Sequence, residues 1–160
     1  MLRMRIPALL VAVSRTGAGC STGATGSSTS ADQESIRKTD EGILAAFARG
    51  DVDGIMAFHH PDVAKALAYD NYAVGSDAVR KNLTETLGRF RLEFIGHHVE
   101  SLAIYGDTAV EQPVFTIKGT PIGGGTPFVF KGRAMVMYLR YGKSPTGWAS
   151  LREIIQPATP

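Results

Sequence analysis

The stretch from Ala45 to Phe58, AAFARGDVDGIMAF, decides the fold that the rest of the sequence can adopt. Gly50 is typical of the position just past a helix end, because glycine takes the left-handed backbone at no steric cost. Asp51 is typical of an N-cap, because its carboxylate can accept a hydrogen bond from the first turn of the next helix. The sequence therefore predicts two consecutive helices that meet at Gly50 and Asp51, followed by an exit loop at residues 59–62 that Pro61 interrupts.

Helical spacing continues on both sides of this junction. Upstream, Ser30 and Gln33 have the spacing of a capping box, so we expect the folded domain to begin near Ser30. Downstream, Ser76 is the expected N-cap of a third helix, because serine accepts hydrogen bonds from first-turn amides. The predicted elements of this half are helices up to Gly50, at about 52–58 and at about 76–90, and a short strand at 64–69.

The second half of the chain changes to β-branched and aromatic residues with strand spacing. Gly106 and Asp107 predict a tight hairpin turn, and three consecutive glycines at 123–125 predict a loop. Helices followed by a meander of strands indicate an α+β protein whose sheet curls around the helices. The predicted strands cover residues 92–105, 108–118, 128–141 and 148–156.

Composition limits the function classes that remain open. The chain has 160 residues, enough for one domain, and its 17 basic and 15 acidic side chains give a net charge of +2. Without a basic block, nucleic acid is not an expected partner. His97 and His98 would point to opposite faces of a regular strand, and His59 and Asp62 are only two ligands, so we expect no metal site.

The first thirty residues resemble an export signal followed by a tether. Arg3 and Arg5 precede a short apolar run that ends near Val13, which suits a signal peptide better than a membrane span. Cys20, the single cysteine, lies where a lipoprotein signal places its acylated cysteine. We therefore expect a signal at residues 1–20, a flexible tether at 21–31 and a domain at 32–157, in an exported, periplasmic or membrane-anchored protein; a cytoplasmic protein with an unprocessed tail is the alternative.

Five short motifs follow one another in an order that is typical of one superfamily. They lie at residues 45–53, 75–80, 105–109, 132–133 and 147–148. In this order the chain resembles the nuclear transport factor two-like superfamily, which includes SnoaL-like polyketide cyclases and ketosteroid isomerases. The resemblance implies a cone-shaped α+β fold, with a curved antiparallel sheet packed on three N-terminal helices around a pocket. We expect no cofactor.

The ketosteroid isomerase activity can be compared residue by residue. The resemblance places the isomerase tyrosine at Ile43 and its oxyanion aspartate near Met135 or Val136, and none of these can donate a hydrogen bond to an enolate. Related exported proteins carry histidines in the last strand, where this chain has Arg152 and Ile154. We therefore expect neither isomerase activity nor histidine-dependent chemistry from these positions.

Two carboxylates are candidate catalytic bases. Asp70 closes the short strand before the third helix, where partial burial beside tyrosines would raise its pKa; a turn-forming role is the alternative. Glu111 alternates with apolar residues such as Ala109 and Phe115, so we expect it to face inward and titrate nearer neutral pH. A bulge at Pro113 would reverse that orientation.

The candidate ligand-binding residues are aromatic or basic. Alternation along the last strand puts Trp148 and Arg152 on one face, where Arg152 could bind a carboxylate or an enolate. Arg133 would point inward on the preceding strand, or lie at an edge, and Arg152 could instead pair with a surface carboxylate. The complete candidate set is Tyr69, Tyr72, Arg133, Tyr138, Trp148 and Arg152.

These observations predict a domain that binds a small, largely apolar molecule. If it is an enzyme, the expected step is proton transfer at a carbon next to a carbonyl, with Asp70 or Glu111 as base. A non-catalytic binding or accessory domain and a dimerisation module are the alternatives. The expected partners are a small apolar ligand, a second copy of the chain, and a membrane only through the N-terminal anchor.

Overall fold

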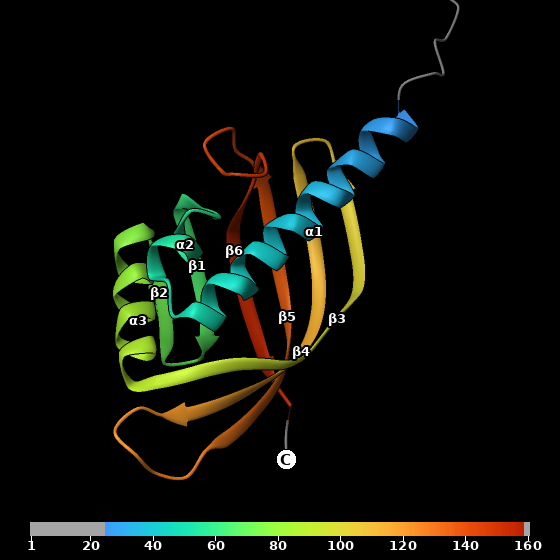
Figure 1. The fold of residues 1–160 in the computed structure, drawn as a ribbon. Coiled ribbons are helices and arrows are strands. Elements are labelled where there is room, and N and C mark those ends of the chain that lie inside the picture. The colour runs from blue at the N-terminus through green and yellow to red at the C-terminus, as the bar shows by residue number, and fades with distance from the viewer. Residues whose placement is uncertain (1–24, 159–160) are drawn as a thin grey trace, which may run out of the picture.

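A computed structural model describes residues 25–158 and shows three helices packed on one six-stranded sheet (Figure 1). The elements follow the chain in this order: α1 (Thr25–Arg49), α2 (Val52–Met56), β1 (His59–Ala68), β2 (Asn71–Val74), α3 (Ser76–Arg89), β3 (Phe90–Tyr105), β4 (Thr108–Pro121), β5 (Phe128–Arg140) and β6 (Trp148–Pro157). The predicted signal sequence and Cys20 lie outside the described residues, so export and acylation stay predictions.

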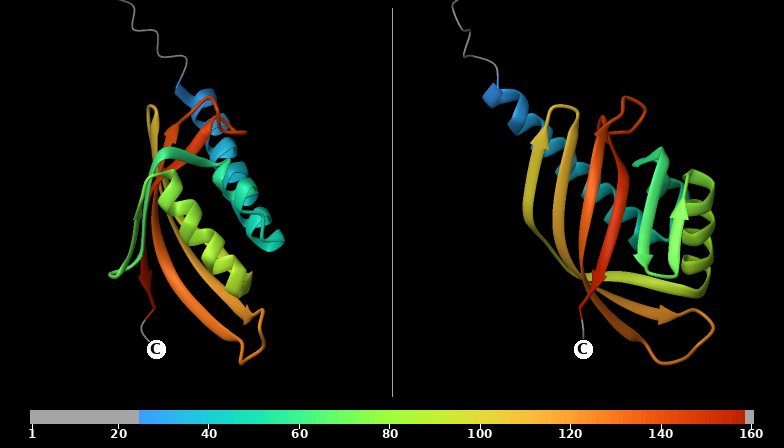
Figure 2. Two further views of the ribbon diagram at one scale, coloured as in Figure 1. Left: turned by 90° about the vertical axis from the view of Figure 1, so that its left-hand side faces the viewer. Right: turned by 180° about the vertical axis from the view of Figure 1, so that it is seen from behind.

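The sheet has the strand order β2-β1-β6-β5-β4-β3, and the three helices lie against one face of it (Figure 2). Its strands curve, and α1 crosses this concave face diagonally. The α+β architecture is thus confirmed, with one correction to the predicted sheet. The pair β1–β6 is parallel, so the sheet is mixed, because the helical half contributes its own hairpin beside the last strand.

The junction between α1 and α2 has the predicted geometry. Gly50 has a φ of 66°, and the Asp51 carboxylate accepts a hydrogen bond of 2.8 Å from the Gly54 amide. The expected loop at residues 59–62 is instead the start of β1. Pro61 fits there because the register with β6 shifts between His59 and Ala64, which leaves no ladder bond for a proline to break.

One predicted helix start and one predicted N-cap are wrong. The first helix begins at Thr25, so the expected capping box at Ser30 lies inside it and its first residues belong to the segment expected to be a tether. The N-cap of α3 is Gly75 rather than Ser76. Gly75 has a φ of 85°, a backbone conformation that favours glycine over serine, and its amide donates to the Val63 carbonyl at 2.7 Å.

A β-bulge in β6 changes which of its side chains face the helices. Tyr138 of β5 pairs with Ser150, but Met137 pairs with Arg152, so Leu151 is an extra residue in β6. Beyond the bulge the inward and outward positions are exchanged. The prediction that Trp148 and Arg152 share one face is therefore wrong.

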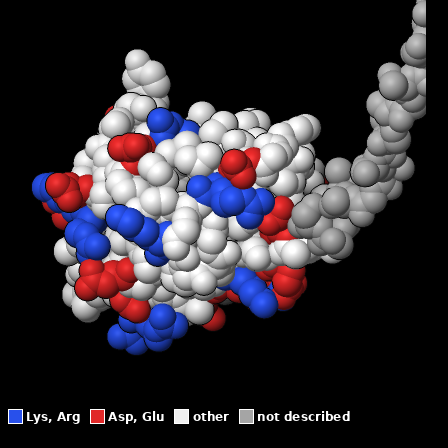
Figure 3. Space-filling view, turned by 90° about the horizontal axis from the view of Figure 1, so that it is seen from above, with Lys and Arg blue, Asp and Glu red and all other residues white. Residues whose placement is uncertain are grey.

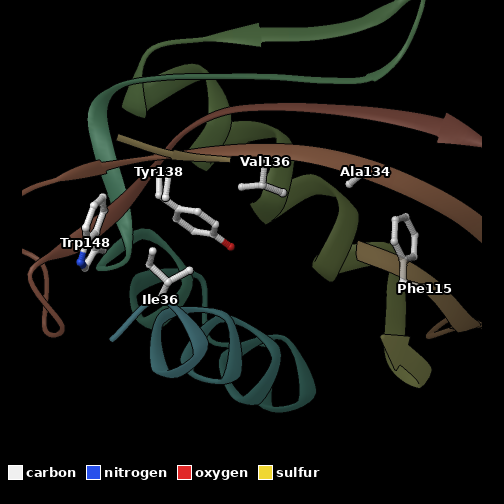
Figure 4. Packing of buried hydrophobic residues seen from close by; sticks show 7 residues of the cluster. Ile36, Phe115, Ala134, Val136, Tyr138 and Trp148 are labelled. Atoms are coloured by element: carbon white, nitrogen blue, oxygen red, sulfur yellow. The ribbon is translucent and has the colours of Figure 1, made fainter. Parts of the chain in front are cut away.

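The buried side chains form two clusters beneath the helices. The first joins α1 to strands β4, β5 and β6 through residues that include Ile36, Tyr138 and Trp148 (Figure 4). The second joins α1, α2 and α3 to β1 and β2 and includes Ile55 and Val79. The space between the two clusters is not filled, and it forms the cavity described below.

Charged side chains of both signs are mixed on the surface seen from above (Figure 3). Exposed ion pairs among the described residues include Arg133 with Glu100 and Arg37 with Glu34. Within residues 25–158, no helix combines the length and the apolar character needed to cross a membrane.

The Asp51 cap should make a measurable contribution to stability. Replacing Asp51 by alanine removes the acceptor of the Gly54 amide and should lower the free energy of unfolding by about 1 kcal/mol, as typical N-cap losses do. Urea unfolding followed by circular dichroism measures this difference. Glu93→Ala, which removes an exposed carboxylate from β3, is the control and should change stability by less than about 0.5 kcal/mol. Equal losses in both variants would contradict the capping role.

Candidate functional site

An apolar cavity of about 240 Å³ lies between the concave face of the sheet and the helices α1 and α3. It is small for a ligand site, but its apolar lining with a few polar groups is typical of one. Figure 4 shows part of this lining along β4 and β5. The apolar lining comprises Ile43, Leu44, Phe47, Leu67, Leu83, Leu92, Phe94, Pro113, Phe115, Ile117, Phe130, Ala134, Val136 and Ile155.

Asp40 and His97 are the first polar pair in this cavity. Asp40 projects from α1 and His97 from β3, and the Asp40 Oδ2 and His97 Nε2 atoms are 3.4 Å apart. Both side chains are largely buried, at 17% and 19% exposure. Burial raises the pKa of Asp40, and the nearby Glu153 carboxylate adds to this, whereas the charge of His97 lowers it. A carboxylate and an imidazole held together at an apolar surface can hold or move a proton.

This pair was not predictable from strand alternation, for a physical reason. Leu92 and Phe94 point into the cavity, and regular alternation from them would turn His98 inward. The register between β3 and β4 shifts between Phe94 and Gly96, and this irregularity turns His97 inward instead. Asp40 did leave a signal in the sequence, because it interrupts the apolar stripe of the first helix.

Lys65 and Glu153 form a second polar pair that lines the cavity. They lie opposite each other on the parallel strands β1 and β6, and the Lys65 ammonium donates a hydrogen bond to the Glu153 carboxylate. Lys65 is only 7% exposed. A buried ammonium needs such a partner, because leaving it unpaired would cost several kcal/mol, roughly 3–5 in comparable cases.

Glu111 and Tyr138 form a third pair on the neighbouring strands β4 and β5. The Tyr138 hydroxyl donates a hydrogen bond of 3.0 Å to the Glu111 carboxylate, and both residues are at most 2% exposed. Burial and, secondarily, the charge of Asp40 raise the pKa of Glu111 to about 7, while the hydrogen bond from Tyr138 lowers it. Glu111 therefore has the inward orientation that alternation predicted, with its proton largely retained below neutral pH.

Asp70 is not part of this site. It lies in the turn between β1 and β2 and is exposed, as are its neighbours Tyr69 and Tyr72. None of these three residues lines the cavity. Asp70 therefore has the turn position that was its alternative role, because Asp and Asn are favoured where a hairpin reverses direction.

The two candidate arginines also lie outside the cavity. Arg133 is exposed on the outer face of β5 and binds Glu100 through two hydrogen bonds of 2.8 and 2.9 Å. The bulge in β6 turns Arg152 to the same outer face, where it donates to the Asp62 carbonyl at 2.7 Å. Trp148 is buried in the core, with the Arg140 guanidinium 4.5 Å from its ring centre, and it does not reach the cavity. Of the predicted ligand-binding residues, only Tyr138 lines the cavity.

The remaining histidines do not gather around an ion. His59 is buried, its Nδ1 donates to the Ile55 carbonyl at 2.8 Å, and burial lowers its pKa to about 3, so the ring is neutral. Within residues 25–158, no three His, Cys, Asp or Glu side chains converge as a group of metal ligands would.

Glu111 should make stability depend on pH. Its pKa in the folded protein, about 7, exceeds the ordinary value of 4.5, so this contribution is complete below pH 4.5 and is lost as the pH rises through 7. Urea unfolding at pH 4.5 and at pH 8 measures the free energy of unfolding of the wild type and of Glu111→Gln, which keeps the shape of the side chain without its charge. From the lower to the higher pH, the wild type should lose up to roughly 3 kcal/mol more of this free energy than the variant does. The same pH dependence of the unfolding free energy in both proteins would contradict the raised pKa of Glu111.

Comparisons with known proteins match this geometry to one family. A SnoaL-like domain matches residues 41–143, and no similar sequence is found among curated proteins. A conserved protein from Planctomyces limnophilus is similar in structure, with a TM-score of 0.71 and 21% identity, over 81% of this chain and 99% of that one.

Two further solved structures are similar at lower identity. A protein from Novosphingobium aromaticivorans, provisionally named a scytalone dehydratase, has a TM-score of 0.72 and 15% identity over 84% of this chain and 89% of its own. A type 2 hexachlorocyclohexane dehydrochlorinase has a TM-score of 0.67 and 10% identity over 84% of this chain and 94% of its own. At such identities these structures show a shared fold alone. The chain therefore belongs to the SnoaL-like family and has the nuclear transport factor 2-like fold.

Proposed function

We propose that this protein binds a small, largely apolar carbonyl compound in its cavity and removes a proton from the carbon next to the carbonyl. The Asp40–His97 pair is the observation that carries this proposal. It is a carboxylate and an imidazole, 3.4 Å apart, on a surface that is otherwise mostly apolar. The base is thus His97, in place of Asp70 or Glu111.

The roles within the pair follow from charge. Asp40 binds one ring nitrogen of His97 and leaves the other nitrogen as the base. When His97 takes a proton, the imidazolium is stabilised by the adjacent carboxylate, which lowers the cost of proton transfer. An apolar cavity strengthens this attraction because water does not screen it.

Lys65 is suited to stabilise the enolate that proton removal creates. Its ammonium has three N–H groups, of which Glu153 accepts one, so the others can donate to an oxygen in the cavity. This replaces the tyrosine and aspartate of the isomerases, whose positions are apolar here: Ile43 and Val136 both line the cavity.

Names among the structural relatives support the same class of chemistry. One relative is named a dehydratase and another a dehydrochlorinase. Loss of water or of hydrogen chloride from neighbouring carbons requires removal of a proton from carbon, which is the step proposed here. The non-catalytic alternative predicts that no carboxylate approaches a hydrogen-bond donor in the cavity, whereas Asp40 and Glu153 both do.

Exchange of carbon-bound hydrogen tests the proposal without knowledge of the natural substrate. The protein is incubated with benzylacetone, a small aromatic ketone, in deuterium oxide, and deuterium entering next to the carbonyl is followed by NMR. We expect exchange above the buffer rate, and a loss of roughly 100-fold or more in His97→Asn. Asp40→Asn should also reduce it, because the imidazolium loses its partner.

His98→Asn is the matched control for the exchange experiment. His98 is the exposed neighbour of His97 on the same strand, and its replacement should leave the exchange rate unchanged. Exchange that is absent in the wild type, or that is equal in the His97 and His98 variants, would show that His97 is not a base.

We also propose that the outer face of the sheet pairs with a second copy of the chain. Met135 and Ile154 are paired neighbours on β5 and β6 and are 49% and 61% exposed, so they form a contiguous apolar surface that a second copy would cover.

Sedimentation over a range of concentrations tests this pairing. The wild type should dimerise, and Met135→Glu should raise the dissociation constant by about tenfold or more, because a buried unpaired carboxylate costs more than about 1.4 kcal/mol. Val74→Glu alters an exposed apolar residue of β2 and is the control. A wild type that stays monomeric at every concentration would refute the dimer.

A further inference from the structure

The Glu111–Tyr138 pair has no part in the proton removal described above, yet its buried position beside the cavity indicates a functional role. Both side chains are buried polar groups, at 2% and 1% exposure, in a region where an apolar pair would pack at no cost in desolvation. Tyr138 lines the cavity and Glu111 does not, so the tyrosine lies between the carboxyl group and any bound ligand. Figure 4 shows the Tyr138 hydroxyl directed toward the side where Val136 and Ala134 line the cavity.

The order Glu111, Tyr138, cavity would allow a proton to pass from the carboxyl group to a bound ligand. A protonated Glu111 can donate to the Tyr138 oxygen across their 3.0 Å contact, which frees the tyrosine O–H to donate toward the cavity. The raised pKa of Glu111 keeps that proton on the carboxyl group up to about pH 7. Tyr138 alone would be a weak acid, because burial raises its pKa further above the ordinary value.

A hydroxyl group beside Tyr138 completes a polar end of the cavity. Ser150 lies opposite Tyr138 on β6, lines the cavity and is 1% exposed. Among the described residues, no hydrogen-bond partner reaches its Oγ atom. A buried hydroxyl without a partner at a cavity wall is suited to bind an oxygen atom of a ligand.

We propose that Glu111, acting through Tyr138, delivers a proton to the leaving oxygen of the substrate, with Ser150 binding that oxygen. The substrate class is then a β-hydroxy carbonyl compound, and the reaction is loss of water. This inference rests on the proposed function, because it needs a base that removes the proton from carbon.

The step balances without any further reactant. His97 takes the proton from the carbon next to the carbonyl, and the electrons of the C–H bond form the new C=C bond. The C–O bond at the neighbouring carbon breaks, and its oxygen takes a proton from Tyr138 and leaves as water. Glu111 restores the Tyr138 proton; afterwards His97 loses a proton to solvent and Glu111 regains one.

Other charged groups face the pair and influence when it holds its proton. The charges of Asp40 and Glu153 disfavour ionisation of Tyr138, and Asp40 does the same for Glu111. Besides Tyr138, the titratable groups that line the cavity are Asp40 from α1, Lys65 from β1, His97 from β3 and Glu153 from β6. Delivery of the proton should fail as the pH rises through about 7, where Glu111 ionises.

Two compounds that differ only in their leaving group test the proton delivery. They are the β-hydroxy ketone formed from benzaldehyde and acetone, and the matching β-chloro ketone; both eliminate to benzylideneacetone, which is followed by its ultraviolet absorbance. Chloride leaves as an anion and needs no proton, whereas the hydroxyl group must take up a proton and leave as water. We expect Tyr138→Phe and Glu111→Gln to lower kcat for the hydroxy ketone by roughly 100-fold or more, with little change for the chloride.

The chloride also serves as the folding control, because a variant that still eliminates chloride has an intact cavity and base. His97→Asn should lose both reactions. The wild-type rate with the hydroxy ketone should fall above about pH 7, and the rate with the chloride should not fall in that range. A merely structural role of Glu111 would move both reactions together.

Infrared spectroscopy gives a readout that needs no substrate. The wild type should show the carbonyl band of a buried protonated carboxyl group that disappears as the pH passes about 7 and is absent in Glu111→Gln. Absence of that band in the wild type overturns the proton path whatever the kinetics.

The kinetic outcomes separate the two proposals. Exchange with benzylacetone but no elimination of the hydroxy ketone, or equal losses for both leaving groups, overturns the proton path and leaves His97 as base. Absence of exchange and of both eliminations overturns the two proposals together.

Discussion

The packing of α1 across the concave face of the sheet is the constraint on which the other features depend. The helix is straight and the sheet is concave, so side chains such as Ile36 fill the space at one end but cannot fill it along the whole length. The unfilled part is the cavity. Asp40 lies on the stretch of α1 above it and meets His97 from the strand below, so one packing mismatch supplies both the binding space and the polar pair inside it.

Burial explains why the charged groups of the cavity occur in pairs. An isolated charge there would lose most of its hydration, so each is stabilised by a neighbour: Asp40 by His97, and Lys65 by Glu153. Glu111 follows the other route and keeps its proton beside Tyr138. Asp40 beside an imidazole in the cavity and Glu111 beside a phenol behind it thus differ in their setting, and this difference separates a carboxylate that supports the base His97 from a carboxyl group that can act as an acid.

The elements of the fold were predictable because their signals are local. Gly50 and Asp51 mark the helix junction through backbone preference and capping, and the period-two pattern marks the four long strands. Glu111 was predictable as an inward residue because β4 keeps its alternation at that point. The parallel pairing of β1 with β6 was not predictable, because it joins segments that are far apart in the sequence and that no tight turn connects.

The sequence by itself determined the order of helices and strands, the α+β class and the family, because these follow from spacing and turn residues. Only the tertiary structure decided which polar residues share the cavity. Irregular pairing at Phe94–Gly96 turned His97 inward, and the extra residue Leu151 turned Arg152 outward. A single added residue exchanges the two faces of a strand, and whether it is added depends on the neighbouring strand rather than on the strand itself.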